Sequence, residues 1–276
     1  MTSIPRNLPL SILEELSILF SDYFVQNIKV DHRYQLLNQI QWSRYLTASK
    51  DELMHYPLFP TFITPDRIFS ESHDIWKEIL LQWENALSPT RQELISQLLE
   101  HLYASPLFYS VYERLQSYDI FSENIEAYRR YFRQIWFGQY TWDQFTPTSS
   151  TSTPRTCGFQ HVYIGEKHGT KIKGLHYWKR YYILEKTGRL LLEKIHKIHP
   201  DLHISSLRFK VDNAVKPYGT IFFGLPMDFE MLIFFCAFLV GVNREVSFFI
   251  DGAQTTVVCY DVATQSDALA TAFFKY

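Results

Sequence analysis

The chain has 276 residues, of which 46% are hydrophobic and 17% aromatic, and its formal net charge is -2. This composition excludes a globally disordered chain and predicts one large globular domain or two modest ones. A net charge this close to zero does not by itself indicate a nucleic-acid-binding protein.

Three further features concern the compartment in which the protein acts. The three cysteines form no CxxC pair and no even framework, which favours a reducing compartment. The first residues lack the apolar core of a signal peptide, and the longest apolar run, at residues 231–242, is too short to span a bilayer. We therefore expect a cytoplasmic protein without a membrane segment, with secretion as the alternative, and the oligomeric state stays unknown.

The first half of the chain predicts helices. Apolar residues recur at helical spacing within residues 11–24, 88–103, 105–116 and 122–138. Ser11 and Glu14 have the spacing of a capping box at the first of these helices. The run at residues 231–242 is compatible with either a buried helix or a buried strand.

The second half of the chain predicts mainly strands. A Ser/Thr/Pro-rich stretch at residues 146–156 predicts a surface loop or linker. Beyond this stretch the pattern favours strands, with a turn at Asp251-Gly252. The predicted strands cover residues 159–165, 176–185, 207–212, 220–224, 245–252 and 254–262. We therefore expect an α+β fold, with a helical region at 1–145, a loop at 146–156 and a strand-rich catalytic region at 157–276.

Positive charge is concentrated near the middle of the chain. Residues 155–216 contain 13 Lys or Arg and 5 Asp or Glu, together with six of the ten histidines. A polyanion would experience this local field within roughly 8 Å, the Debye length at physiological salt. A solvated basic face without a ligand explains the same charge equally well.

His161 and His176 are the candidate acid and base. Each lies in a predicted strand, and a glycine-containing loop between the strands predicts an antiparallel hairpin that brings the two rings close together. Two imidazoles with pKa values near about 6.5 can remove the 2′-hydroxyl proton of RNA and protonate the departing 5′ oxygen. The alternative is that both are structural histidines.

Lys216 is the candidate cation for the transition state of such a reaction. It lies in the segment "VKPYGTIFFG", where Pro217 and Gly219 predict a tight turn before a strand and Thr220 adds a hydroxyl. A fixed cation stabilises the developing negative charge more than it stabilises the ground state. The alternative is an exposed surface lysine without a catalytic role.

Three segments in order resemble the EndoU, or XendoU, family of poly(U)-preferring endoribonucleases. They are "GFQHVYIGE", "GLHYWKRYYILEKTG" and "KPYGTIFFGLPMDFEMLIFF", and the upstream segments "PLF" and "IWFGQY" are also similar to the family. The resemblance extends from about residue 50 to the end of the chain. It implies an α+β endoribonuclease that cleaves single-stranded RNA at uridines and leaves 2′,3′-cyclic phosphate ends.

The resemblance also implies roles for individual residues. His161 would be the general acid, His176 the general base and Lys216 the third member of a catalytic trio. Glu166 would support the hairpin or a neighbouring imidazole, and Thr220 would contact the uracil base. Many cellular members of the family depend on or are stimulated by Mn²⁺, although no ligand set for a metal is evident in this sequence.

The sequence departs from the family pattern at two places that concern substrate binding. Gln160 stands where the family often has Glu, and this change weakens any metal or charge role there. Tyr260, in "VVCYDV", matches a base-stacking tyrosine only after a shift of one residue. These departures place the preference for uridine in doubt more than they place cleavage in doubt.

Two other groups of residues have a weaker connection to function. Lys179 lies in an aromatic and basic stretch that suits single-stranded RNA, with one face of the predicted strand in the core. His196, His199 and His203 have a spacing that could suggest metal ligands, but Pro200 interrupts any helix, and a solvated loop is the simpler interpretation. Two other functions remain as alternatives: a catalytically weak RNA-binding relative and a toxin-like or effector-like module that acts on a protein partner.

Overall fold

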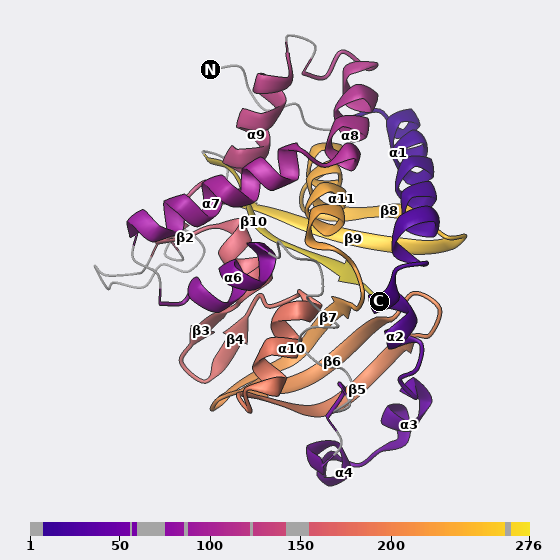
Figure 1. Ribbon diagram of the computed structural model, residues 1–276, viewed down its shortest axis with the longest axis vertical. Helices are drawn as coiled ribbons and strands as arrows, with labels where there is room; N and C mark the ends of the chain where they lie inside the picture. Colours follow the sequence, from indigo (N-terminus) through magenta and orange to yellow (C-terminus); the bar gives the residue numbers. More distant parts are fainter. Residues whose placement is uncertain are drawn as a thin grey trace. The chain divides into compact units, whose positions relative to one another are not determined.

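The computed structural model of the protein describes residues 8–55, 57–59, 75–85, 88–121, 124–141, 155–262 and 266–276. The chain forms two compact units, each of which combines helices with a β-sheet (Figure 1). Unit 1 comprises Met1–Phe24, Leu99–Val162 and Asp228–Lys275, and unit 2 comprises Val25–Leu98, Tyr163–Met227 and Tyr276. The predicted α+β class is therefore confirmed, and each unit draws on both halves of the chain.

Unit 1 contains an antiparallel sheet with strand order β10-β9-β8 and several long helices. Its helices are α1 (Leu10–Tyr23), α8 (Pro106–Gln116), α9 (Ile125–Phe137) and α11 (Met227–Val240), together with the end of α7 (Ser88–Tyr103). Its strands are β1 (Tyr140–Thr141), β2 (Arg155–Thr156), β8 (Arg244–Ile250), β9 (Ala253–Val262) and β10 (Ser266–Lys275).

Helix α11 is the centre of the hydrophobic core of unit 1, where α1, α9 and the sheet all contact it. The ring of Phe229 meets Phe20 of α1, with 5.3 Å between centroids, and Phe235 meets Phe132 of α9 at 5.0 Å. The ring of Phe234 meets Phe274 of β10 at 4.9 Å. A helix that is apolar on all sides requires burial on all sides, and this packing explains why the apolar run at 231–242 forms a helix.

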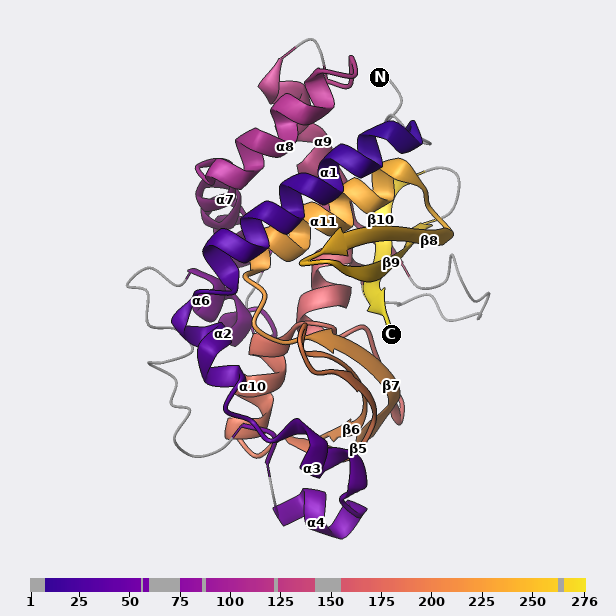
Figure 2. The ribbon, with the colours of Figure 1, turned by 90° about the vertical axis from the view of Figure 1, so that its right-hand side faces the viewer.

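Unit 2 contains a five-stranded sheet with order β3-β4-β7-β6-β5, in which only the β4–β7 pair is parallel. Its helices are α2 (His32–Leu37), α3 (Trp42–Thr47), α4 (Lys50–His55), α6 (Ile75–Gln82) and α10 (Trp178–Lys186), and α7 begins in this unit. Its strands are β3 (Glu166–His168), β4 (Lys171–Lys173), β5 (Leu190–His199), β6 (Ile204–Val211) and β7 (Ala214–Phe222). Helix α10 lies against β5, as Figure 2 shows.

The predicted helices of the first half are confirmed, with corrections at their starts. The capping box of Ser11 and Glu14 does not form, because α1 begins one residue earlier with Pro9 at its N-cap and no side-chain cap. Helix α9 begins at Ile125, where Asn124 Oδ1 accepts a hydrogen bond from the N–H of Ala127 at 2.9 Å. Ser122, the predicted start, lies outside the described residues.

Two of the predicted strands are wrong, and they are the two that carry the histidines. Residues 160–164 form a π-helix (η3, Gln160–Ile164), and residues 178–186 form helix α10. Strand prediction relies on alternation between a buried and an exposed face, but every residue from 178 to 184 is buried. The predicted hairpin is also displaced, because β3 and β4 form it within the segment that joins the two histidines.

The remaining strand predictions are mostly confirmed. Strands β6, β8 and β9 overlap the predicted segments closely, whereas β7 begins six residues before its predicted start and ends at Phe222. Asp251 and Gly252 form the turn between β8 and β9 with φ values of 50° and 75°. Strands β5 and β10 were not predicted. Of the predicted loop at 146–156, Arg155 and Thr156 form strand β2, and the other residues lie outside the described part of the chain.

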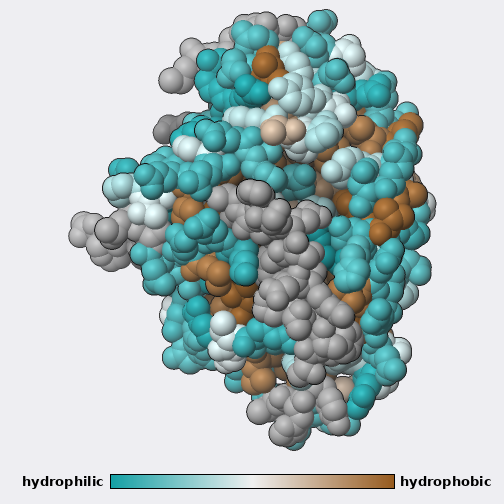
Figure 3. Space-filling view, in the orientation of Figure 1, coloured by the Kyte–Doolittle hydropathy of each residue, from teal (hydrophilic) through white to brown (hydrophobic). Residues whose placement is uncertain are grey.

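On the face shown in Figure 3, the described residues are mainly hydrophilic, with hydrophobic areas that lie apart from one another. Helix α1 exposes Leu10 and Ile18, and Figure 3 shows hydrophobic areas along the edge where α1 lies. None of the helices in the described segments has the length and apolar character needed to cross a membrane.

Candidate active site

The backbone before α10 positions His176 in unit 2. Gly174 and Leu175 both have left-handed conformations, with φ values of 64° and 60°, and a positive φ at a leucine is a strained conformation. Gly165 lies against this turn with φ of 82°, and a Cβ added to it would lie 2.8 Å from the Cβ of Leu175. Only glycine at position 165 therefore allows this close approach, and the contact fixes the position of Leu175, the residue before His176.

A hydrogen bond orients the His176 ring. Its Nδ1 lies 3.2 Å from the backbone carbonyl oxygen of Thr220 in strand β7. A carbonyl oxygen can only accept a hydrogen bond, so Nδ1 carries the proton and Nε2 keeps the lone pair of the neutral ring. The imidazole is 7% exposed. This arrangement produces the tautomer that a general base needs, with the basic nitrogen at Nε2.

Lys216 lies within strand β7, so the prediction that it stands on a turn before the strand is wrong. Pro217 and Tyr218 form a bulge there, because two residues of β7 stand against Arg208 of β6. A Cβ at Gly219 would lie 2.9 Å from the ring of Phe209 and 3.3 Å from Cγ of Lys216. The lysine side chain therefore lies closely over the backbone of Gly219, beside Thr220.

The charge of Lys216 has no counter-ion among the described residues of unit 2, and its side chain is 8% exposed. Burial, together with the positive charge of Lys173 in β4, lowers the pKa of Lys216 to about 8. Two lysines that repel one another in a poorly hydrated place favour the binding of an anion. The sequence reasoning missed Lys173, whose only signal was its place in the basic segment "KIKG".

The residues predicted to act with His176 and Lys216 are divided between the two units. Glu166, Lys179 and Thr220 belong to unit 2, whereas Gln160, His161 and Tyr260 belong to unit 1. Within unit 2 the structure brings His176, Thr220 and Lys216 together, through the hydrogen bond to the Thr220 carbonyl and the close packing of Lys216 over Gly219.

His161 lies on the π-helix η3, in the part of it that belongs to unit 1. Its backbone N–H donates a hydrogen bond to the carbonyl oxygen of Cys157 at 3.0 Å, and its side chain is 5% exposed. The ring of Phe159 packs against Phe137 of α9, with 5.2 Å between centroids. These contacts anchor the backbone that carries Gln160 and His161 to unit 1.

Tyr260 lies on strand β9 of unit 1, with its side chain 44% exposed. Its strand partner in β10 is Thr271, next to a register shift between the two strands. The neighbouring residue Cys259 points into the core, where its Sγ lies 3.5 Å from the carbonyl oxygen of Phe234. The alternation of the strand therefore places Tyr260 on the face opposite the core of unit 1.

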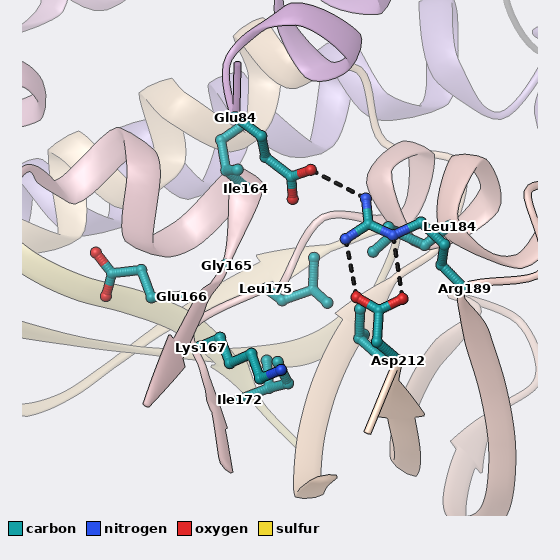
Figure 4. Close-up of a pocket in the computed structure, with 11 residues that line it drawn as sticks. Glu84, Ile164, Gly165, Glu166, Lys167, Ile172, Leu175, Leu184, Arg189 and Asp212 are labelled. Atoms are coloured by element: carbon teal, nitrogen blue, oxygen red, sulfur yellow. Dashed lines mark hydrogen bonds and ion pairs between the residues drawn. The ribbon is translucent and has the colours of Figure 1, made fainter. Parts of the chain in front are cut away.

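Glu166 lies on β3 beside a small pocket of about 80 Å³ in unit 2 (Figure 4). Its Oε2 is 4.0 Å from Nε2 of His168, a neighbouring imidazole on the same strand. Three other charged residues of the pocket form an ion-pair network, in which Arg189 binds Glu84 at 3.0 Å and Asp212 at 3.0 Å. The carboxylate of Glu166 points away from this ion-pair network, as Figure 4 shows.

Lys179 is buried in helix α10, with 1% of its side chain exposed. Its ammonium lies 6.0 Å from the centroid of the Trp178 ring. The structure therefore does not bring Lys179 to the surface where an RNA phosphate could reach it.

The histidines of the segment "HKIHPDLH" do not form a loop of solvated side chains. His196 and His199 lie on strand β5, and His203 is buried between the rings of Tyr34 and Trp42. Burial lowers the pKa of His203 to about 4, so that ring stays neutral. Among the residues that the structure describes, no group of three or more His, Cys, Asp or Glu side chains could hold a metal ion.

Comparison with known proteins gives the same family over most of the chain. The family model described as "Endoribonuclease XendoU" matches residues 76–274. Uridylate-specific endoribonuclease B of Danio rerio is 25% identical over 181 residues, which cover 63% of this chain and 62% of the relative. Poly(U)-specific endoribonuclease-B of Xenopus laevis is 33% identical over 115 residues, which cover 38% of this chain and 39% of the relative.

The solved structure titled "The structure of XendoU: a splicing independent snoRNA processing endoribonuclease" shares the fold. The two chains superpose with a TM-score of 0.69 and 19% sequence identity, over 94% of this chain and 96% of the other. At this identity the likeness establishes the fold alone. The matched region spans less than two thirds of the length of the zebrafish and frog relatives.

Proposed function

The chain belongs to the XendoU endoribonuclease family, and we propose on that basis that it cleaves single-stranded RNA on the 3′ side of uridine. The ribose 2′-oxygen attacks the adjacent phosphorus, the bond from phosphorus to the 5′ oxygen breaks, and the products carry a 2′,3′-cyclic phosphate and a 5′-hydroxyl. The observation that carries the proposal is the cluster in unit 2, where an oriented imidazole and a buried, uncompensated lysine meet on strand β7.

His176 acts as the general base in this proposal. Because the Thr220 carbonyl accepts the Nδ1 proton, the lone pair of Nε2 takes the proton of the 2′-hydroxyl. The resulting imidazolium keeps its hydrogen bond to the carbonyl, so the ring does not need to reorient during the step. The strained turn at Gly174 and Leu175 fixes the position of the ring, which is typical of strain at functional sites.

Lys216 stabilises the negative charge that develops on the non-bridging oxygens of the phosphate. Its low exposure keeps water away from the ammonium, and an electrostatic interaction is stronger in such a place than in bulk water. Lys173 adds a second positive charge to the same region. The phosphate of the substrate would supply the counter-ion that the described residues of unit 2 do not provide.

His161 donates the proton to the departing 5′ oxygen in this proposal. The order of the motifs that carry His161, His176 and Lys216 along the chain supports this role, and all three residues lie within the region that the family model matches.

Uridine is the proposed base at the cleavage site. The names of the zebrafish and frog relatives describe uridylate-specific and poly(U)-specific enzymes. Thr220, beside Lys216, offers a hydroxyl for the uracil edge, and Tyr260 offers an exposed ring. Because the matched tyrosine is shifted by one residue in the sequence, Tyr260 is the weaker of these two assignments.

No step of this mechanism passes through Mn²⁺, because the described residues form no cluster suited to the ion. A requirement for Mn²⁺ that acts through the substrate is compatible with the chemistry, and a titration of the cleavage rate with Mn²⁺ measures it. We also infer a cytoplasmic site of action, supported by Cys157, Cys236 and Cys259, which are all buried and form no disulfide bond among the described residues.

The test is incubation of the pure protein with a mixed-sequence RNA, followed by mass analysis of the ends. We expect cyclic phosphates that follow uridines. Binding without any cleavage product would favour the alternative of a catalytically weak RNA-binding relative. Neither binding nor cleavage would contradict the proposal and would favour a function directed at a protein partner.

A further inference from the structure

His196 and Tyr218 form a stacked aromatic pair on the sheet of unit 2. Their ring centroids lie 4.5 Å apart, with an angle of 24° between the planes. His196 Nε2 is 3.2 Å from the carbonyl oxygen of Pro217, so Nε2 donates a hydrogen bond and fixes the imidazole against the tyrosine. Tyr218 is nevertheless 69% exposed, which leaves much of its ring surface open to solvent.

Two β-bulges create this pair. His196 is an extra residue of β5 between the pairs Ile195–Leu207 and Lys197–Ser206, and Tyr218 lies in the bulge of β7. Bulges turn a side chain away from the regular alternation of its strand, and they are frequent near functional sites. Leu207 of β6 pairs with both Ile195 and Gly219, so the two bulges lie at the same level on either side of β6.

The charge of the surrounding strands suits a polyanion. Lys194 and Lys197 flank His196 on β5, and both are exposed. Strands β6 and β7 contain no acidic residue, and the single acid of β5, Glu193, is bound by Arg208 at 2.8 Å, Lys210 at 3.2 Å and Lys50 at 3.3 Å. Along strands β5, β6 and β7, positive side chains therefore outnumber negative ones, and the one carboxylate is ion-paired, which favours a phosphate.

We propose that the Tyr218 ring, backed by His196, is a stacking site for the base of a nucleotide next to the scissile phosphate of single-stranded RNA. The inference rests on the proposed function, because Lys216 and Thr220 lie two residues to either side of Tyr218 in the same strand. A base that stacks on the open face of Tyr218 would orient the chain across Lys216. Stacking uses the π-face that every base possesses, so this position accepts any base.

The test uses a hexanucleotide with a single ribouridine in a 2′-deoxy background, so that only one phosphate can be cleaved. In a matched series, each flanking base in turn is replaced by an abasic residue. We expect the wild type to lose roughly 5- to 100-fold in kcat/KM, through KM, when the stacked base is missing. Tyr218→Ala should show that loss on the intact substrate and no further loss on the abasic one.

Three variants serve as controls for this experiment. Tyr218→Phe keeps the ring and should behave as the wild type, whereas His196→Ala removes the backing ring and should lose part of the effect. Tyr276→Ala is the matched control, because Tyr276 is also an exposed tyrosine beside a histidine of β5. Its ring is tilted by 57° to His199, the last residue of that strand, and does not stack on it, so we expect no change.

The possible outcomes separate this inference from the proposed function. Equal kcat/KM for wild type and Tyr218→Ala on the intact substrate would overturn the stacking site and leave the cleavage activity in place. If Tyr218→Ala lost as much further kcat/KM on the abasic substrates as the wild type does, that result would overturn the stacking site as well. A wild type that cleaves none of the substrates would remove the proposed function, and the stacking site with it.

Discussion

Strand β7 of unit 2 and helix α11 of unit 1 each bury an ionisable side chain, and they do so in opposite ways. Lys216 in β7 keeps 8% of its surface exposed, and its pKa falls only to about 8. Glu230 in α11 is fully buried, neither carboxyl oxygen has a hydrogen-bond partner among the described residues, and burial raises its pKa well above the usual range. At neutral pH the lysine is mostly charged and the glutamic acid is neutral.

The difference between these two regions shows what a buried charge requires. Next to Lys216 the bulge exposes Pro217 and Tyr218, so solvent or a substrate can reach the edge of the site. Apart from Asp228 at its start, the other residues of α11 are apolar and buried, so a charged carboxylate at Glu230 would not be solvated. A side chain that must contact a phosphate therefore lies at an edge that solvent can reach. A carboxyl group in the core is compatible with the fold only in its neutral, protonated form.

Among the substitutions near strand β7, removal of the general base His176 should reduce the cleavage rate the most. His176→Ala removes the imidazole that the Thr220 carbonyl orients, and loss of a general base costs roughly 10²–10⁴ in kcat. Single-turnover cleavage of oligouridine measures this loss. His32→Ala provides the control, because His32 is an exposed histidine of α2 in the same unit and should leave the rate unchanged. Cleavage by His176→Ala at the wild-type rate would refute the assignment.

Removal of the Lys216 cation should reduce the cleavage rate slightly less than removal of His176, and it should stabilise the fold. Lys216→Met removes the charge that stabilises the transition state, and we expect a loss of roughly 10²–10³ in kcat. Because burial lowers the pKa of Lys216, the charged form destabilises the folded state below about pH 8. We therefore expect the free energy of unfolding at pH 7 to rise on the order of 1–3 kcal/mol in urea denaturation. A stability loss would contradict the picture of an uncompensated cation.

The same lysine should set an alkaline limit to the activity. The charged form is needed for catalysis, and its pKa of about 8 means that the wild-type rate should fall as the pH rises through 8. Lys216→Arg keeps a positive charge at all accessible pH values, so any activity that it retains should not decline in that range. The measurement is kcat from pH 6 to 10, and parallel declines in the two proteins would show that another group limits the rate.

Substitution of Glu230 in helix α11 should change the stability of the fold and leave the cleavage activity unaffected. Glu230→Leu replaces an unpaired buried carboxyl with an apolar side chain and should raise the free energy of unfolding by about 1–3 kcal/mol. Because the folded-state pKa of Glu230 is raised, the wild type should also lose stability as the pH rises above the unfolded pKa of about 4.3.

Glu230→Gln is the matched control for this substitution, because it keeps the shape and the buried polar group. It should gain little stability at acidic pH and should show a weaker pH dependence than the wild type. A Glu230→Leu protein less stable than the wild type would mean that the carboxyl has partners beyond the described residues.

The last predicted effect, on stability alone, concerns Glu185 of α10. Its carboxyl has hydrogen-bond donors among the described residues, unlike that of Glu230. Its half-buried carboxyl accepts hydrogen bonds from the backbone N–H groups of Leu58 at 3.0 Å and Phe59 at 2.9 Å, and desolvation raises its pKa to about 7. A raised pKa in the folded state means that stability increases as the pH falls through 7. We expect a difference on the order of 1–3 kcal/mol between pH 8 and pH 5 that is absent in Glu185→Gln, measured by urea denaturation.

Local patterns in the sequence predicted the elements whose burial follows a simple period. Strand β9 was predicted because it is rich in residues that favour strands and follows the turn at Asp251-Gly252, and α9 was predicted because its apolar residues recur at helical spacing. Helix α10 was predicted as a strand because its aromatic residues are buried on every side, which removes the helical period as well as the strand period. Strand β5 was missed because its two bulges, at Glu193 and His196, break the alternation.

The order and spacing of the histidine, glycine and lysine motifs were enough to indicate the family and the residues that could perform its chemistry, because such motifs are local in the chain. The tertiary structure alone decided that Nδ1 of His176 faces a carbonyl 44 residues away, that Lys216 is buried beside Lys173, and that Tyr218 stacks on His196. Tautomer, pKa and stacking depend on neighbours that are distant in sequence and on exclusion of water, and those conditions exist only in the folded chain.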